Sequence, residues 1–210
     1  MQNHAQDAKG RGRPPKQRGD KLLTREMLVH GTEVLTEKGY SAVGVDEILQ
    51  RTGISRCSFY YYFKTKEGFG AELIDRYRHF ITQKLERCLS DTSLSPLGSL
   101  RAFVGEVRDE MARTDCRSGC LAGKLAQEVN TLPENFREQL SAVFAEWQDV
   151  FARGLKRAQE TGEISPELDC ASTAAFFWYG WEGALQRANL ELNIKPVDIF
   201  IGNFFSRLTG

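Results

Sequence analysis

The segment Cys116-Arg-Ser-Gly-Cys-Leu-Ala-Gly-Lys124 holds the side chain with the clearest chemical potential, the thiol of Cys120. The segment is rich in small residues and opens a helix predicted over 120–130. A thiol at a helix N-terminus has a lowered pKa because the helix dipole favours the thiolate, and Arg117 and Lys124 act in the same direction. The sequence therefore predicts a nucleophilic thiol at Cys120, with a buried and inert cysteine as the alternative.

The cysteines do not form the pattern of a disulfide or metal framework. Their number, five, is odd and their spacing is irregular. Cys116 and Cys120 have no histidine near them in the sequence to complete a zinc site. His4, His30 and His79 fall in the N-terminal tail or the early helices, so none is placed to activate a thiol. We expect no metal, no cofactor and no catalytic residue.

The helical periodicity of the sequence predicts the elements that position these residues. Thr24 is a candidate N-cap for a first helix that ends at Gly39. A second helix begins at Val45, and Ser55 is a candidate N-cap for a third that ends near Phe63. A helix, a tight turn containing glycine and a short helix are typical of a helix-turn-helix. Further helices are predicted near 66–90, 96–114, 120–130, 133–161, 168–191 and 196–208.

The predicted fold class is therefore all-α, with three parts. Residues 1–20 form a flexible basic arm rich in Gly, Pro, Lys and Arg. Residues 21–66 form an N-terminal three-helix helix-turn-helix domain, and residues 67–210 form a larger helical domain. Residues 1–66 carry 12 Lys and Arg against 7 Asp and Glu, whereas residues 67–210 carry 16 against 21. This asymmetry is typical of a nucleic-acid-binding end joined to a body with another role.

The third helix carries a family resemblance. Gly53-Ile-Ser-Arg-Cys-Ser-Phe-Tyr-Tyr-Tyr-Phe-Lys-Thr-Lys-Glu67 resembles the recognition segment of TetR-type repressors. Similarity to the regulators of acrylate utilisation continues through Gly119-Cys-Leu-Ala-Gly-Lys-Leu-Ala-Gln-Glu128 and Phe177-Trp-Tyr-Gly-Trp-Glu-Gly-Ala184. The electrophile-sensing repressor of N-ethylmaleimide reductase is a more distant likeness. The resemblance implies a regulator, in the family's habit a repressor, released from a pseudo-palindromic operator by a small molecule. Acrylate, its CoA thioester and other electrophiles are the candidate effectors.

The resemblance also implies how double-stranded DNA is held. The third helix enters the major groove, where the guanidinium of Arg56 matches O6 and N7 of guanine. Phosphates are expected to be bound by Lys66 and by backbone N–H groups near Thr24 and Val45. Phe59 and Phe63 are assigned to the core. The remaining expected contacts are Ser58, Tyr60, Tyr61 and Tyr62.

Two features of this end have alternatives. Three consecutive tyrosines cannot all face inward, so the alternative of an aromatic core helix still leaves at least one hydroxyl exposed. Cys57 stands where many relatives carry Gly, and it is either a redox switch or a small residue that fits. In the arm, Arg11-Gly-Arg-Pro14 resembles an AT-hook core, so Arg11 and Arg13 are expected to follow a narrow minor groove. The alternative for the arm is non-specific phosphate contact.

The larger domain is expected to bind the effector and to dimerise. An apolar pocket is predicted among its aromatic residues, although plain core is the alternative for most of them. The candidates are Trp147, Trp178, Tyr179, Trp181, Phe144, Phe151, Phe176 and Phe177. Glu182 and Arg187 are charges in an apolar stretch that contact either the ligand or each other across a dimer. Cys120 corresponds to the reactive thiol of the electrophile sensors, with Lys124 nearby, but Asn189 stands where those sensors carry a lysine.

The last two helices are the predicted homodimer interface. An apolar stripe suits burial against a partner chain, and it consists of Phe200, Ile201, Phe204, Phe205 and Leu208. No apolar run approaches the ~18 residues that cross a membrane, and the polar N-terminus lacks a signal peptide. We therefore expect a cytoplasmic protein with no membrane partner. The competing functions are a small cysteine-dependent enzyme acting on electrophiles and an architectural DNA binder.

Overall fold

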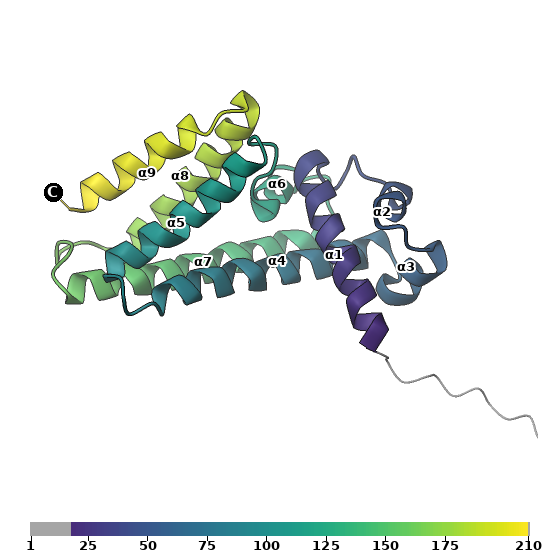
Figure 1. Ribbon diagram of the computed structural model, residues 1–210, viewed down its shortest axis with the longest axis horizontal. Helices are drawn as coiled ribbons and strands as arrows, with labels where there is room; N and C mark the ends of the chain where they lie inside the picture. Colours follow the sequence, from purple (N-terminus) through teal and green to yellow (C-terminus); the bar gives the residue numbers. More distant parts are fainter. Residues whose placement is uncertain (1–17, 210) are drawn as a thin grey trace, which may run out of the picture.

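The computed structural model describes residues 18–209, with side chains from residue 25 onward. Within these residues the chain forms helices and no strand, which confirms the all-α class. The first three helices form the compact end at the right of Figure 1. They are α1 (Arg18–Lys38), α2 (Val45–Thr52) and α3 (Arg56–Phe63). The others are α4 (Lys66–Leu89), α5 (Pro96–Arg113), α6 (Leu121–Gln127), α7 (Glu134–Glu160), α8 (Cys170–Glu191) and α9 (Lys195–Leu208).

Local signals set the turn between α2 and α3. Gly53 ends α2 in the left-handed region at φ 66°, a conformation that glycine adopts without a steric penalty. Ser55 then caps α3, because its hydroxyl accepts the N–H of Ser58 at 3.1 Å. Thr65 caps α4 in the same way through the N–H of Gly68. The predicted helix-turn-helix is therefore confirmed at the N-terminal end of the chain.

The long helices pack into one body. Helix α4 leaves the N-terminal end and lies along α7, while α5 and α8 cover the other side and α9 packs on α8 (Figure 1). Short α6 lies between this body and α1, and it contacts α1, α4 and α7. Most of the predicted stripe on α9 packs within the chain, with Phe204 and Phe205 buried and Phe200 against Gly180 of α8. Among residues 18–209, no helix is both long and apolar enough to cross a membrane.

Some boundaries differ from those that the sequence predicts. Helix α1 begins at Arg18, so the prediction that Thr24 is its N-cap is wrong. The first turn, Arg18-Gly-Asp-Lys21, carries no apolar residue through which helical periodicity would reveal it. Helix α6 ends at Gln127 rather than near residue 130. Helix α8 begins at Cys170, because the Asp169 carboxylate accepts the N–H groups of the next turn.

Candidate functional site

Helix α3 presents two faces. Phe59 and Phe63 are buried and pack against the Phe69 ring of α4 in tilted and edge-on arrangements, as expected for core residues. On the other face Tyr60 and Tyr61 are 39% and 45% exposed. An aromatic core therefore accounts for only part of the helix, and two tyrosine rings lie on its outer surface. Tyr62 is half-buried against the core, so its position differs from that of its two neighbours.

The polar residues of α3 already have local partners. The guanidinium of Arg56 pairs with the Asp46 carboxylate of α2, and both side chains are well exposed. Exposed pairs of this kind contribute little net stability, so the guanidinium is able to exchange Asp46 for another acceptor. The Ser58 hydroxyl lies 2.9 Å from that of Ser55. Cys57 is exposed on the same helix.

The groups expected to bind phosphate differ in whether they are free to accept a new partner. Val45 is the first residue of α2, whose N-cap Gly44 has no side chain to bind the free N–H groups of the first turn. Thr24 lies inside α1, so its N–H is not at a helix N-terminus. The Lys66 ammonium donates to the carbonyl of Tyr40 at 2.7 Å and lies 4.1 Å from the centre of the Tyr40 ring. Burial lowers the pKa of Lys66.

Lys66 therefore connects α4 to the loop after α1, because its half-buried ammonium donates a hydrogen bond to the Tyr40 carbonyl. A phosphate contact by Lys66 would require the ammonium to leave the Tyr40 carbonyl. The AT-hook-like residues Arg11 and Arg13 lie outside the described residues.

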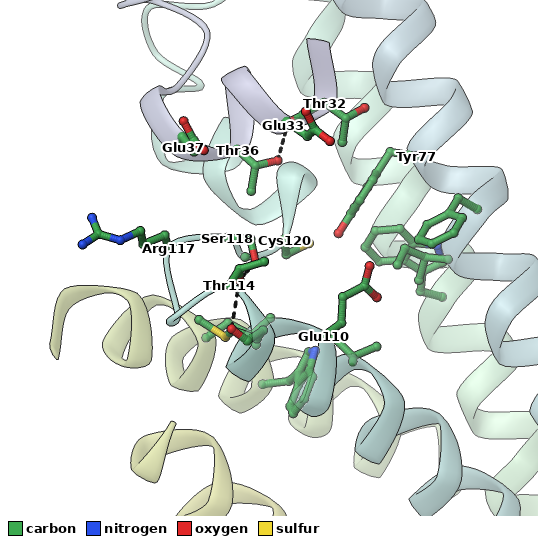
Figure 2. A pocket seen from close by; sticks show the side chains of 18 of the residues that line it. Thr32, Glu33, Thr36, Glu37, Tyr77, Glu110, Thr114, Arg117, Ser118 and Cys120 are labelled. Atoms are coloured by element: carbon green, nitrogen blue, oxygen red, sulfur yellow. Dashed lines mark hydrogen bonds between the residues drawn. The ribbon is translucent and has the colours of Figure 1, made fainter. Parts of the chain in front are cut away.

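A cavity of about 570 Å³ lies between the N-terminal end and the helical body. Its walls come from α1, α4, α5, α7 and α8 and from the loop that precedes α6. The inner wall is aromatic and includes Tyr77, Phe103, Trp147, Trp178 and Trp181. Figure 2 shows the polar residues gathered around this space, with the Tyr77 hydroxyl and Cys120 facing it and Arg117 extending away. The volume is within the range of pockets that hold drug-sized ligands.

The three tryptophans predicted to line a pocket do so, but other aromatic candidates do not. Phe176 and Tyr179 are 60% and 71% exposed and face away from the core. Phe151 and Phe177 stack with their ring centres 4.1 Å apart inside the core. The reason is that α8 is apolar on several sides, so its periodicity does not identify the face that meets the cavity.

One indole in this wall lacks a partner. Trp178 is 2% exposed, and its Nε1–H has no hydrogen-bond partner among the described residues. The neighbouring Trp147 stacks on Trp178, but its own Nε1–H donates to the carbonyl of Arg78 at 3.4 Å. An unpaired buried donor costs free energy, and a ligand with an oxygen acceptor would satisfy it.

Cys120 is the N-cap of α6 and lies at the polar end of the cavity. Its sulfur accepts the N–H of Gly123 at 3.4 Å. Burial raises the pKa of the Cys120 thiol well above its ordinary value, and the negative charge of Glu182 raises it further. The hydrogen bonds from Gly123 and the Tyr77 hydroxyl lower this pKa only in part.

The prediction of a lowered pKa at Cys120 is therefore wrong. The helix dipole and nearby cations favour a thiolate only where the thiol is not desolvated beside a carboxylate. Arg117 extends away from the thiol (Figure 2). The thiol at rest is protonated.

Glu182 and Lys124 line a smaller cavity of about 70 Å³ on the other side of Cys120. The Glu182 carboxyl packs against the α6 backbone at Gly123, where an added Cβ atom would clash with Oε2. Burial raises the pKa of Glu182 to about 7, and a hydrogen bond with Cys120 opposes that shift. Arg187 pairs with Glu191, one turn further along α8. Asn189 donates to the carbonyls of Cys116 and Arg117, which holds the loop before α6.

Two residues of the site, Tyr77 and Glu128, were not predicted from the sequence. The Tyr77 hydroxyl interacts with the Cys120 thiol, and burial raises the pKa of that hydroxyl. Glu128, at the other end of α6, accepts the backbone N–H groups of Tyr40 and Ser41 in the loop between α1 and α2. Neither has a local signal in the sequence, because both act through partners on other helices.

Comparison with known proteins agrees with this architecture. The family described as "Bacterial regulatory proteins, tetR family" matches residues 28–73, and the one described as "Tetracyclin repressor-like, C-terminal domain" matches residues 96–204. The chain is 43% identical over 194 residues to the transcriptional regulator AcuR of Cereibacter sphaeroides, covering 92% of this chain and 89% of that protein. It is 27% identical over 184 residues to the HTH-type transcriptional repressor NemR of Escherichia coli K12, covering 83% and 88%.

A solved structure is also similar. The crystal structure of a regulatory protein TetR from Rhodobacter sphaeroides matches with a TM-score of 0.85 and 43% identity, covering 87% of this chain and 97% of that chain. The similarity therefore extends over both the helix-turn-helix and the helical body that holds the cavity.

Proposed function

Because this chain belongs to the TetR family of bacterial transcription regulators, we propose that it is a repressor that leaves its operator when a small electrophile enters the cavity. The observation that supports this proposal most directly is the composition of the cavity wall. Val29, Thr32 and Thr36 of α1, in the DNA-binding end, line the same space as Cys120 and Trp178. A ligand there contacts both parts of the protein at once.

Release requires that the ligand favour one conformation. A ligand that binds both conformations equally shifts nothing, so it must prefer the one that does not fit DNA. Contact with α1 supplies such a preference, because a ligand wedged between α1 and α5 changes the angle at which the helix-turn-helix is held. Helix α4 carries this change as well, since it begins at Lys66 beside α3 and contributes Tyr77 to the cavity.

DNA is read by the outer face of α3. We assign the base contact to Arg56, supported by Ser58 and the exposed tyrosines Tyr60 and Tyr61, and a phosphate contact to the first turn of α2 at Val45. Arg11 and Arg13 add a minor-groove contact in this proposal. A homodimer matches the pseudo-palindromic operator.

The dimer surface is assigned to α8 and α9. Large apolar side chains are exposed along these two helices, and an apolar face left open on a helix needs a cover. They are Phe176, Tyr179 and Leu190 of α8, Leu192 at the C-cap of α8, and Ile199 of α9. The partner is a second copy of this chain, packed through the last two helices.

The effector class follows from the cavity. Its walls are aromatic, its volume of about 570 Å³ far exceeds that of acrylate, and its polar end carries the Cys120 thiol. Acryloyl thioesters and other carbonyl compounds with an adjacent double bond fit this combination better than a small acid alone. The thiol adds to such double bonds.

The test is DNA binding under titration. Labelled DNA from upstream of the protein's own coding region is titrated with wild-type protein and with Cys120→Ser, and acrylate or acryloyl-CoA is then added. Loss of dimeric binding in the wild type alone supports the thiol as sensor, whereas release from both proteins supports recognition by the cavity without the thiol. If the wild-type protein shows no sequence-specific DNA binding, the proposal is contradicted. Sustained consumption of the electrophile would indicate a cysteine-dependent enzyme instead.

A further inference from the structure

Three titratable groups from three parts of the fold meet at one point. Tyr77 comes from the middle of α4, Cys120 from the N-cap of α6 and Glu182 from α8. Tyr77 and Cys120 line the larger cavity, Cys120 and Glu182 line the smaller one, and both neighbours affect the pKa of the thiol. Glu182 Oε1 is buried and has no hydrogen-bond partner among the described residues. One carboxyl oxygen therefore remains free to accept a proton.

A buried, protonated thiol is a poor nucleophile. The thiolate is the species that attacks carbon, and at Cys120 burial and the neighbouring carboxylate both oppose its formation. If Cys120 reacts at neutral pH, its proton must leave as the new bond forms, and an acceptor must lie within reach. The cluster contains one such acceptor, Glu182.

The surroundings contain few competitors for this role. Lys124 lines the smaller cavity with Glu182, and it is a donor when charged. The other charged groups that line the larger cavity come from α1, α4, α5 and the loop before α6. They are Glu33, Glu37, Arg76, Glu110 and Arg117. Glu33, Glu37 and Glu110 have partners of their own in His30, Arg51 and Lys84.

We propose that Glu182 accepts the thiol proton of Cys120 while the sulfur adds to a carbon–carbon double bond conjugated to a carbonyl group. The inference rests on the proposed function, because it explains how the sensing thiol reacts. The S–H bond breaks and the proton moves to a Glu182 oxygen. The sulfur forms a bond with the β-carbon, the double bond shifts to give an enolate, and the proton then passes from Glu182 to the α-carbon. No oxidant or reductant takes part.

The carbonyl oxygen of the electrophile needs a donor as the enolate forms. Trp178 lines the same cavity as Cys120, is buried, and has an unpaired indole N–H. This second observation, independent of the thiol, indicates that the cavity takes a ligand with an oxygen acceptor. The site therefore favours a compound whose conjugated carbonyl group is itself uncharged, such as a thioester or an amide.

The expected pH profile distinguishes this mechanism from simple ionisation of the thiol. Glu182 accepts a proton only when ionised, and its pKa is about 7. The rate of Cys120 alkylation should therefore rise from acid pH and level off above about pH 8, one unit above that pKa. A thiol that ionises unaided would instead keep gaining rate toward its own, well-raised pKa.

The experiment measures alkylation of the full-length protein by acrylamide, an uncharged conjugated carbonyl compound, without DNA. Peptide mass spectrometry follows Cys120 and the exposed Cys57 separately from about pH 5.5 to about pH 9. Cys57 is an internal control for reagent and pH. The variants are Glu182→Gln, which keeps the size of the side chain, and Glu191→Gln, a control at the exposed end of the same helix.

The expected result is a loss of at least about tenfold in the Cys120 rate for Glu182→Gln relative to Cys57, with Glu191→Gln unchanged. Equal Cys120 rates in wild type and Glu182→Gln, or a wild-type rate that rises without levelling off, overturn the inference. The wild-type pH profile is decisive by itself if Glu182→Gln fails to fold. If alkylation of Cys120 depends on Glu182 but leaves the DNA bound, the inference stands and the proposed function is contradicted. If acryloyl-CoA releases the DNA equally from wild type and Glu182→Gln, the proposed function stands and the inference is contradicted.

Discussion

Glu128 and Tyr40 join the two ends of this protein. The Glu128 carboxylate, at the C-cap of α6, accepts the backbone N–H of Tyr40 at 3.1 Å through one oxygen and that of Ser41 at 2.8 Å through the other. Gly39 makes this approach possible, because it has φ 83° and an added Cβ atom there would clash with Glu128 Oε1. Cys120 is the N-cap of α6 and Glu128 is its C-cap, so a shift of this short helix reaches the DNA-binding end directly.

Replacing Glu128 with glutamine should weaken this connection. The amide offers one acceptor and turns a donor toward the other N–H, so we expect a loss of about 1–2 kcal/mol in the free energy of unfolding. In the DNA-release titration, the effector should release a smaller fraction of the bound DNA at saturation. Glu138→Gln, an exposed position on α7, is the control. Equal behaviour of the two variants in both measurements would refute the connection.

The contact between Gly123 and Glu182 gives a second prediction. Alanine usually stabilises a helix interior over glycine by about 0.5–1 kcal/mol. At Gly123 the added Cβ would displace the Glu182 carboxyl, so Gly123→Ala should instead destabilise the protein. In a Glu182→Ala background the clash is absent, and the same change should become neutral or stabilising. Denaturant unfolding of the four proteins measures this coupling, and additive effects would contradict it.

The buried carboxyl of Glu182 predicts a pH-dependent stability. Burial raises its pKa from 4.5 to about 7, so the folded state binds this proton more tightly than the unfolded state. The stabilising contribution is complete below about pH 4.5 and is lost as the pH rises to about 7. The loss amounts to about 3 kcal/mol at most. The difference in unfolding free energy between wild type and Glu182→Gln should change over this window, and a constant difference would exclude the raised pKa.

Arg56 predicts the behaviour of the DNA-binding surface. Arg56→Ala should weaken specific operator binding by about 1–3 kcal/mol while changing non-specific binding much less. Asp46→Asn frees the guanidinium from its exposed partner, so it should leave affinity unchanged or raise it. Fluorescence anisotropy with operator and scrambled duplexes at one fixed salt concentration measures both effects. An equal loss on both duplexes would reassign Arg56 to the phosphates.

The sequence predicts those parts of the structure that depend on neighbouring residues. The turn at Gly53, the cap at Ser55 and the inward position of Phe59 all follow from side chains within one or two turns. The same local reasoning fails at Cys120. There the helix dipole is a local signal, but the desolvation and the carboxylate that raise the thiol pKa come from α4 and α8. Periodicity also fails on α8, where apolar residues on several sides hide which face meets the cavity.

The two stacked tryptophans give a matched pair of variants. Trp178→Phe loses ring area and removes an N–H that has no partner. Removing that N–H should not lower the free energy of unfolding, and it should partly offset the loss of ring area. Trp147→Phe removes an N–H that bonds to the carbonyl of Arg78, so about 1 kcal/mol of stability should be lost in addition. The effector response should show the opposite order, because only the Trp178 donor is available to a ligand.

The concentration of acryloyl-CoA that releases half of the bound DNA measures that response. We expect it to rise by about fivefold to tenfold for Trp178→Phe, the value of one hydrogen bond to an uncharged carbonyl, and to change little for Trp147→Phe. Both variants lose the same ring area from the wall, so a difference between their responses cannot come from lost stacking area. If the two variants respond alike, the unpaired indole N–H has no role in ligand binding.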